Sequence, residues 1–185
     1  MATEPAGNTT QAEDALALEL AVLAECWRQP DQRLASALDA GLFDDISADD
    51  VSIADLRVEH SRLFVGPGDH PCPPYESVYR DREHDQEFGL VMGAATDAIE
   101  RWYWEYGLVP DETWTDLPDH VAVELEFAGH LAATGEHDAL EQFVDEHLGV
   151  WLPEFLDRVE TATTEPFYRA VARATRDIVG GGGGR

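Results

Sequence analysis

Apolar residues recur at intervals of three and four along most of this chain, and this spacing constrains the fold more than any other feature. A first example is the series Leu16, Leu20, Leu23 and Trp27. Side chains spaced in this way lie on one face of an α-helix. No stretch of strand length alternates apolar and polar residues with β-branched enrichment. The sequence therefore predicts an all-α protein.

Helix start and stop signals divide the chain into expected elements. A first helix follows the capping-box spacing of Thr10–Glu13. Further helices are expected at about 31–40, 52–64, 86–106, 119–134, 139–148, after Pro153, and at 166–179. Because 185 residues suit one domain, we expect a single globular domain of roughly eight to ten helices.

The two ends of the chain differ in composition from the part between them. We expect residues 1–10 to form a disordered lead, 11–179 the helical domain, and the glycine-rich 180–185 a flexible tail. The first residues lack the basic start and apolar middle of a signal peptide. No apolar run approaches the roughly 20 residues that cross a membrane. The expected location is therefore the cytoplasm, without membrane insertion.

The chain is strongly acidic, with 38 Asp and Glu against 12 basic residues, all of them Arg, and a net charge of −26. Self-repulsion at this charge destabilises a compact state, and salt near 1 M screens it because the Debye length falls to about 3 Å. The composition therefore favours a halophilic protein over a surface evolved for a cationic partner. It argues against nucleic-acid binding, which needs Lys and Arg at the phosphates.

A first candidate segment is the interruption of the helical pattern after Leu63. Gly66–Pro74 contains two Gly and four Pro, so it must form a loop. Tyr75 and Tyr79 follow, four residues apart, and can share a helix face. On spacing alone, a structural corner is the favoured interpretation. The alternative is a preformed wall of an apolar groove. A second loop, at about 108–117, contains Pro110 and Trp114.

A second candidate segment opens the helix expected at 119–134. Asp119 stands where a carboxylate caps a helix N-terminus. His120 and Glu124 are four residues apart, and a hydrogen bond between them would favour the protonated imidazole. The structural interpretation is a capped helix with a half-buried histidine. A metal-dependent helical hydrolase using His120, Glu124 and His130 is the catalytic alternative, although the sequence has no His-Glu-x-x-His motif.

Together the two segments resemble the TorD/DmsD/NarJ family. The resemblance rests on Phe-x-Gly-Pro at 64–67, Pro-Pro-Tyr-Glu-Ser-Val-Tyr at 73–79, and Pro-Asp-His at 118–120 before Glu-Leu-x-Phe at 124–127. In helix order it covers about residues 15–178. Leu117 precedes Pro118, and Pro118 directly precedes Asp119, which leaves the subfamily open. The resemblance implies a TorD-like helical fold.

The resemblance further implies a chaperone, not an enzyme, with no cofactor of its own. Its partner would be the apo-subunit of a molybdopterin-dependent oxidoreductase of the DMSO/TMAO or nitrate reductase type. It would hold the twin-arginine signal peptide, or a comparable N-terminal segment, until cofactor insertion. An assembly factor that ignores signal peptides and a homodimer both stay open. The implied peptide-binding residues are Phe64, Gly66, Pro73, Pro74, Tyr75, Glu76, Ser77, Tyr79, Asp119, His120, Glu124 and Phe127.

In such a site, aromatic side chains would hold the apolar run of the leader. Carboxylates such as Glu76 or Asp119 would pair with its arginines. Because rim ion pairs are weak in high salt, we expect apolar contacts to dominate the affinity.

Overall fold

The computed structural model describes residues 7–43, 46, 51–66, 68–109 and 116–181. These residues form α-helices joined by loops and two π-helical segments, η1 (Ser61–Val65) and η2 (Val144–Leu148). They contain no strand, only two isolated bridges. The α-helices are α1 (Gly7–Trp27), α2 (Gln32–Asp39), α3 (Ile53–His60), α4 (Glu76–Arg80), α5 (Ala94–Glu105), α6 (Val121–Ala133), α7 (His137–Phe143), α8 (Gly149–Ala162) and α9 (Pro166–Gly181). The predicted all-α, single-domain fold is confirmed.

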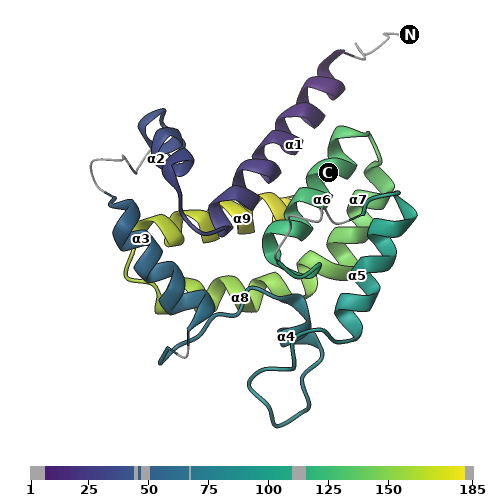
Figure 1. Cartoon of the computed structure of the whole chain (residues 1–185). Helices are drawn as coiled ribbons and strands as arrows, with labels where there is room; N and C mark the ends of the chain where they lie inside the picture. Colours follow the sequence, from purple (N-terminus) through teal and green to yellow (C-terminus); the bar gives the residue numbers. More distant parts are fainter. Residues whose placement is uncertain (1–6, 44–45, 47–50, 67, 110–115, 182–185) are drawn as a thin grey trace.

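The helices pack around α1, α6, α8 and α9 (Figure 1). At Gly129 of α6 a Cβ would lie 3.3 Å from the carbonyl oxygen of Ala17, so glycine lets α6 approach α1 closely. In the core, the indole N–H of Trp27 donates to Thr175 Oγ1 at 3.1 Å, which joins α1 to α9. The ring of Phe155 on α8 lies 5.0 Å from Trp27. Trp27 therefore links α1 to α9 through a hydrogen bond and to α8 through ring packing.

The helix expected at 86–106 is shorter in the structure, where α5 begins at Ala94. A Cβ at Gly89 would lie 2.9 Å from the carbonyl oxygen of Ser77, and one at Gly93 would lie 2.2 Å from Asp81 Oδ2. Asp81 Oδ2 also accepts the N–H of Ala95 at 2.9 Å. Residues 86–93 therefore follow the surface of α4 as a loop because tertiary contacts to both glycines outweigh the helical spacing.

Other boundaries also differ from the predicted ones. Helix α1 begins at Gly7, before the expected boundary at 11, and α9 extends to Gly181. Pro153 lies inside α8 and does not precede the helix. Proline leaves the carbonyl four residues earlier without an intrahelical donor, and Gly149 and Pro153 both lie at the exposed surface. Residues 1–6 and 182–185, and Pro110 and Trp114 of the second expected loop, lie outside the described residues.

Candidate functional site

The two candidate segments lie side by side, although 42 residues separate Ser77 from Asp119. Tyr75 and His120 form an isolated antiparallel bridge. On either side, the N–H of Glu76 donates to the carbonyl of Asp119 at 3.0 Å, and the N–H of Val121 donates to Pro74 at 2.9 Å. Backbone pairing therefore fixes the start of α4 against the start of α6.

Asp119 holds this junction from inside the protein. Its side chain is fully buried, and Oδ2 accepts the N–H of Ser77 at 2.9 Å. A carboxylate in this position satisfies a backbone donor in the first turn of α4. The prediction that Asp119 caps the helix after it is wrong. The cap of α6 is His120, whose Nδ1 accepts the N–H of Ala122 at 3.1 Å.

His120 is held in its neutral form. Burial, together with the positive charge of Arg28, lowers the pKa of His120 to about 3. Its Nδ1 is also occupied as an acceptor, which the protonated ring would not permit. The expectation that Glu124 favours a protonated imidazole is therefore not met. The carboxyl of Glu124 accepts instead from the indole N–H of Trp151 at 3.1 Å.

Glu124 and Glu76 are both fully buried, yet their surroundings differ. Burial, and then the nearby charge of Glu76, raises the pKa of Glu124 well above its ordinary value. Glu76 has cationic and hydrogen-bonding partners: it pairs with Arg80, and Nδ1 of His147 lies 2.9 Å from Oε2. Burial therefore favours the neutral form of Glu124. Both Glu76 and Asp119 are fully buried, so neither presents a carboxylate at the surface to a peptide arginine.

Four of the predicted peptide-binding residues reach the surface in part: Phe64, Gly66, Pro73 and Tyr75. We call them the motif face. The others are buried: Pro74, Glu76, Ser77, Tyr79, Asp119, His120, Glu124 and Phe127. The motif face can contact a ligand directly. The buried residues can act on a ligand only by holding the motif face in position.

The two aromatic rings of the motif face each pack against a histidine ring. Tyr75 meets His120 edge-to-face at 5.3 Å, and Phe64 meets His60 in the same way at 5.0 Å. The charge of Asp116 acts on both Tyr75 and His60. Asp116, which is partly exposed, therefore lies near Tyr75 and His60. Sequence reasoning missed Asp116 as a site residue because its only signal was its place before the Pro-Asp-His motif.

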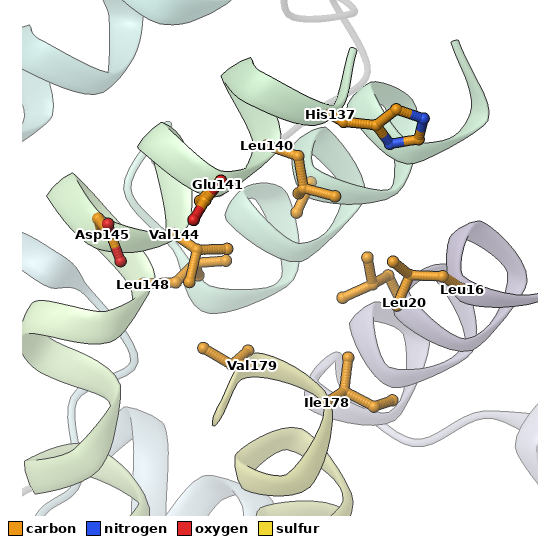
Figure 2. Close-up of a pocket in the computed structure, with 11 residues that line it drawn as sticks. Leu16, Leu20, His137, Leu140, Glu141, Val144, Asp145, Leu148, Ile178 and Val179 are labelled. Carbon is orange, nitrogen blue, oxygen red and sulfur yellow. The ribbon is translucent and has the colours of Figure 1, made fainter. Parts of the chain in front are cut away.

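An apolar cavity of about 240 Å³ lies elsewhere, between α1, α7, η2 and α9 (Figure 2). Leu16, Leu20 and Ile178 form part of its wall, and Glu141 and Asp145 lie at its edge. None of the predicted peptide-binding residues lines it. It is therefore a second apolar surface, separate from the motif face.

The geometry does not support the metal-dependent hydrolase. Within the described part of the chain, no group of three or more His, Cys, Asp and Glu is arranged to hold a metal ion. His120 and Glu124 are engaged with Ala122 and Trp151.

A family model described as nitrate reductase delta subunit matches residues 26–157, which include both candidate segments. The chain belongs to the TorD/DmsD/NarJ family. The resemblance seen in its two motifs is thereby confirmed.

Two characterised relatives and one solved structure illustrate the likeness of this TorD/DmsD/NarJ family member. It is 36% identical to the Tat proofreading chaperone DmsD of Salmonella typhi over 115 residues, 62% of this chain and 54% of that protein. It is 27% identical to the chaperone protein TorD of Shewanella loihica over 128 residues, 69% of this chain and 61% of that protein. The chain thus spans about half the length of its DmsD relative.

A solved structure of a candidate redox enzyme maturation protein from Archaeoglobus fulgidus is also similar. It matches 91% of this chain and 93% of that chain, with a TM-score of 0.61 and 28% sequence identity. The match supports a TorD-like fold for this TorD/DmsD/NarJ family member.

Proposed function

We propose that this protein is a non-catalytic chaperone for a molybdopterin-dependent oxidoreductase. It binds the twin-arginine signal peptide of the apo-subunit, or a comparable N-terminal segment, until the cofactor is inserted. Support comes from its relatives, which are a Tat proofreading chaperone, DmsD, and the chaperone protein TorD. No described helix combines the length and apolar character needed to span a bilayer. We place the chaperone in a salt-rich cytoplasm, where its charge of −26 is screened.

The observation that carries the proposal is the position of Tyr75. Its ring is half-buried, packs against His120, and is anchored by backbone pairs on both sides. An aromatic side chain held in place by buried contacts loses little entropy when a ligand covers it. The motif face is therefore preorganised for an apolar segment, and the buried Asp119 and His120 act by positioning it.

The experiment is a calorimetric titration of the purified protein with a synthetic twin-arginine leader from the same genome. Tyr75→Ala removes accessible aromatic area and should lower the affinity by about tenfold, since 1.4 kcal/mol corresponds to one decade. Trp104→Ala is the matched control because Trp104 is 78% exposed and does not belong to the motif face. Equal affinities for wild type and Tyr75→Ala would contradict the assignment of the face.

A second titration separates the signal-peptide interpretation from the assembly-factor interpretation. The chaperone is mixed with the mature apo-subunit that lacks its leader. Binding of the mature subunit without binding of any leader would favour an assembly factor that ignores signal peptides.

Val179→Phe, at the half-buried wall of the apolar cavity in Figure 2, tests whether the leader uses that cavity instead of the motif face.

A further inference from the structure

A second cavity, of about 600 Å³, lies between α5 on one side and α7 and η2 on the other. Trp102 of α5 and Tyr106, the residue that follows α5, line it, and their rings stack with centroids 6.2 Å apart and planes 10° apart. Both rings are half-buried. Two aromatic side chains that stack on each other therefore form part of the cavity wall.

Carboxylates surround this aromatic wall. Four of the described lining residues are acidic and exposed: Glu105, Glu136, Asp138 and Glu146. Among the same described residues Arg101 is the basic one, and its Nε donates to the carbonyl of Asp97 at 3.1 Å, which holds it on its own helix. Negative charge therefore predominates among the residues that line the cavity, as it does in the whole protein.

A buried histidine also lines the cavity. His147 is 3% exposed, and its Nδ1 lies 2.9 Å from Glu76 Oε2. A carboxylate that is already paired with Arg80 can only accept, so Nδ1 carries the proton. In that tautomer Nε2 is an acceptor, and no described residue hydrogen-bonds to it. The Glu76 of the Pro-Pro-Tyr-Glu-Ser motif thereby fixes the tautomer of a histidine beside the cavity.

These groups define the chemistry of a ligand. The carboxylates favour a cation, Nε2 of His147 can accept from a hydrogen-bond donor, and the aromatic side chains of Trp102 and Tyr106 favour a planar cation. The guanidinium of arginine meets all three requirements, whereas the ammonium of lysine does not stack as a plane. A second copy of this chain is a poor occupant because both copies would carry a charge of −26.

We propose that this cavity binds an arginine side chain of the N-terminal segment of the partner. The proposal rests on the proposed function, and it names where the arginine is recognised. In this proposal the buried Glu76 acts indirectly, because it orients His147. His147 and the carboxylates of the cavity then bind the guanidinium. The motif face holds the apolar part of the segment, and the cavity selects for arginine.

The test is a double-mutant cycle between protein and peptide. The double variant Glu105→Gln/Glu136→Gln removes two exposed carboxylates of the cavity without touching the core. Glu100→Gln is the control because Glu100 is exposed on the same helix and does not line the cavity. The peptides are the twin-arginine leader and the same leader with both arginines changed to lysine, titrated at about 50 mM salt, where surface charges are little screened.

We expect the arginine leader to bind the double variant about fivefold more weakly than it binds wild type and Glu100→Gln, a loss typical of two exposed ion pairs. The lysine leader should bind wild type about tenfold more weakly than the arginine leader because it loses the stacked planar contact. Trp102→Leu should erase that preference for arginine. If the arginine leader binds but all of these ratios stay near one, the cavity assignment is overturned and the proposed function stands.

A second readout is independent of leader binding. The dipeptide N-acetyl-Arg-Arg-amide is titrated into the intact protein while the indole resonance of Trp102 and the imidazole resonances of His147 are followed by NMR. Saturable shifts that weaken in Glu105→Gln/Glu136→Gln support the guanidinium site even if no leader binds and the proposed function fails. Unchanged resonances at both residues would overturn it.

Discussion

The backbone N–H of Ser77 donates to the carboxylate of Asp119 at 2.9 Å, in the buried junction between α4 and α6. This hydrogen bond joins the two sequence motifs by which the family is recognised. It shows that Asp119 acts first as a structural acceptor. Its effect on a bound peptide is indirect, through the position of Tyr75 and the rest of the motif face.

Replacing Asp119 with Ala should therefore lower the stability of the protein. The buried N–H of Ser77 would lose its charged acceptor, at a cost of about 2 kcal/mol in the free energy of unfolding. Urea denaturation followed by circular dichroism measures the loss. Asp116→Ala is the control because Asp116 is partly exposed. If Asp119→Ala were as stable as Asp116→Ala, the structural role of this carboxylate would be excluded.

His120 should make the protein acid-sensitive. Its pKa of about 3 in the folded state lies below the ordinary value of 6.5, so the unfolded chain binds the extra proton between these values. The stabilisation is complete above pH 6.5 and is lost as the pH falls toward about 3. Its slope reaches at most about 1.4 kcal/mol per pH unit for one proton. His120→Asn retains a capping acceptor for α6 but cannot titrate.

The measurement for this prediction is the free energy of unfolding at a series of pH values from about 4 to 8, which brackets the ordinary histidine pKa. The slope should be smaller in His120→Asn than in wild type. Burial also lowers the pKa of His60, which contributes acid sensitivity to both proteins and cancels in the comparison. Parallel curves for the two proteins would refute the assignment of the slope to His120.

Glu124→Gln should stabilise the protein at neutral pH. The raised pKa of Glu124 means that the folded state holds a proton that the unfolded chain has released above pH 4.5, so stability falls as the pH rises. Glutamine is neutral at every pH and can still accept from the indole N–H of Trp151 through its amide oxygen. We expect a gain of about 1 kcal/mol or more at pH 7, because one unit of pKa shift is worth about 1.4 kcal/mol.

Thermal unfolding of wild type and Glu124→Gln at pH 5 and pH 8 measures this gain. The difference between the two proteins should grow with pH. Glu124→Ala provides the contrast because it also removes the acceptor and leaves space around Trp151. A difference that shrank with rising pH would mean that Glu124 is ionised in the folded protein.

Gly93→Ala should destabilise the start of α5 more than Gly107→Ala destabilises its end. The new Cβ at Gly93 would lie 2.2 Å from Asp81 Oδ2, the acceptor for the N–H of Ala95. At Gly107 the φ of +70° strains alanine, but no atom lies within 4 Å of the new Cβ. We expect a loss of about 1 kcal/mol at Gly107 and at least twice that at Gly93, measured by urea denaturation. Equal losses would contradict the steric explanation for the loop at 86–93.

Leader binding should persist in concentrated salt. Apolar and stacking contacts are not screened, whereas the ion pairs of the carboxylate-lined cavity are, so rising salt should remove only the contribution of those ion pairs to the affinity. Titrations from about 50 mM to about 1 M salt measure this, since the Debye length falls to about 3 Å over that range. A fall in affinity by several orders of magnitude would contradict the apolar assignment.

The sequence by itself determined the fold class and the family. Periodic apolar positions such as Leu16, Leu20, Leu23 and Trp27 predict helices because helical spacing is a local property. The ordered pair of motifs, Pro73–Tyr79 and Pro118–His120, was enough to indicate the TorD/DmsD/NarJ family. Local rules were less reliable at element boundaries, as at the loop 86–93, where contacts from Ser77 and Asp81 outweigh helical spacing.

Only the tertiary structure decided which polar residues face inward. Spacing placed Glu76 and Asp119 at the right segments, yet both side chains are fully buried; Glu76 bonds His147, and Oδ2 of Asp119 accepts from the N–H of Ser77. No sequence signal connected Glu76 to His147, which lies 71 residues away. Burial and long-range pairing depend on how helices pack, and a one-dimensional pattern does not contain that information. The tertiary structure therefore moves the candidate arginine contact from the motif carboxylates to the cavity beside Trp102.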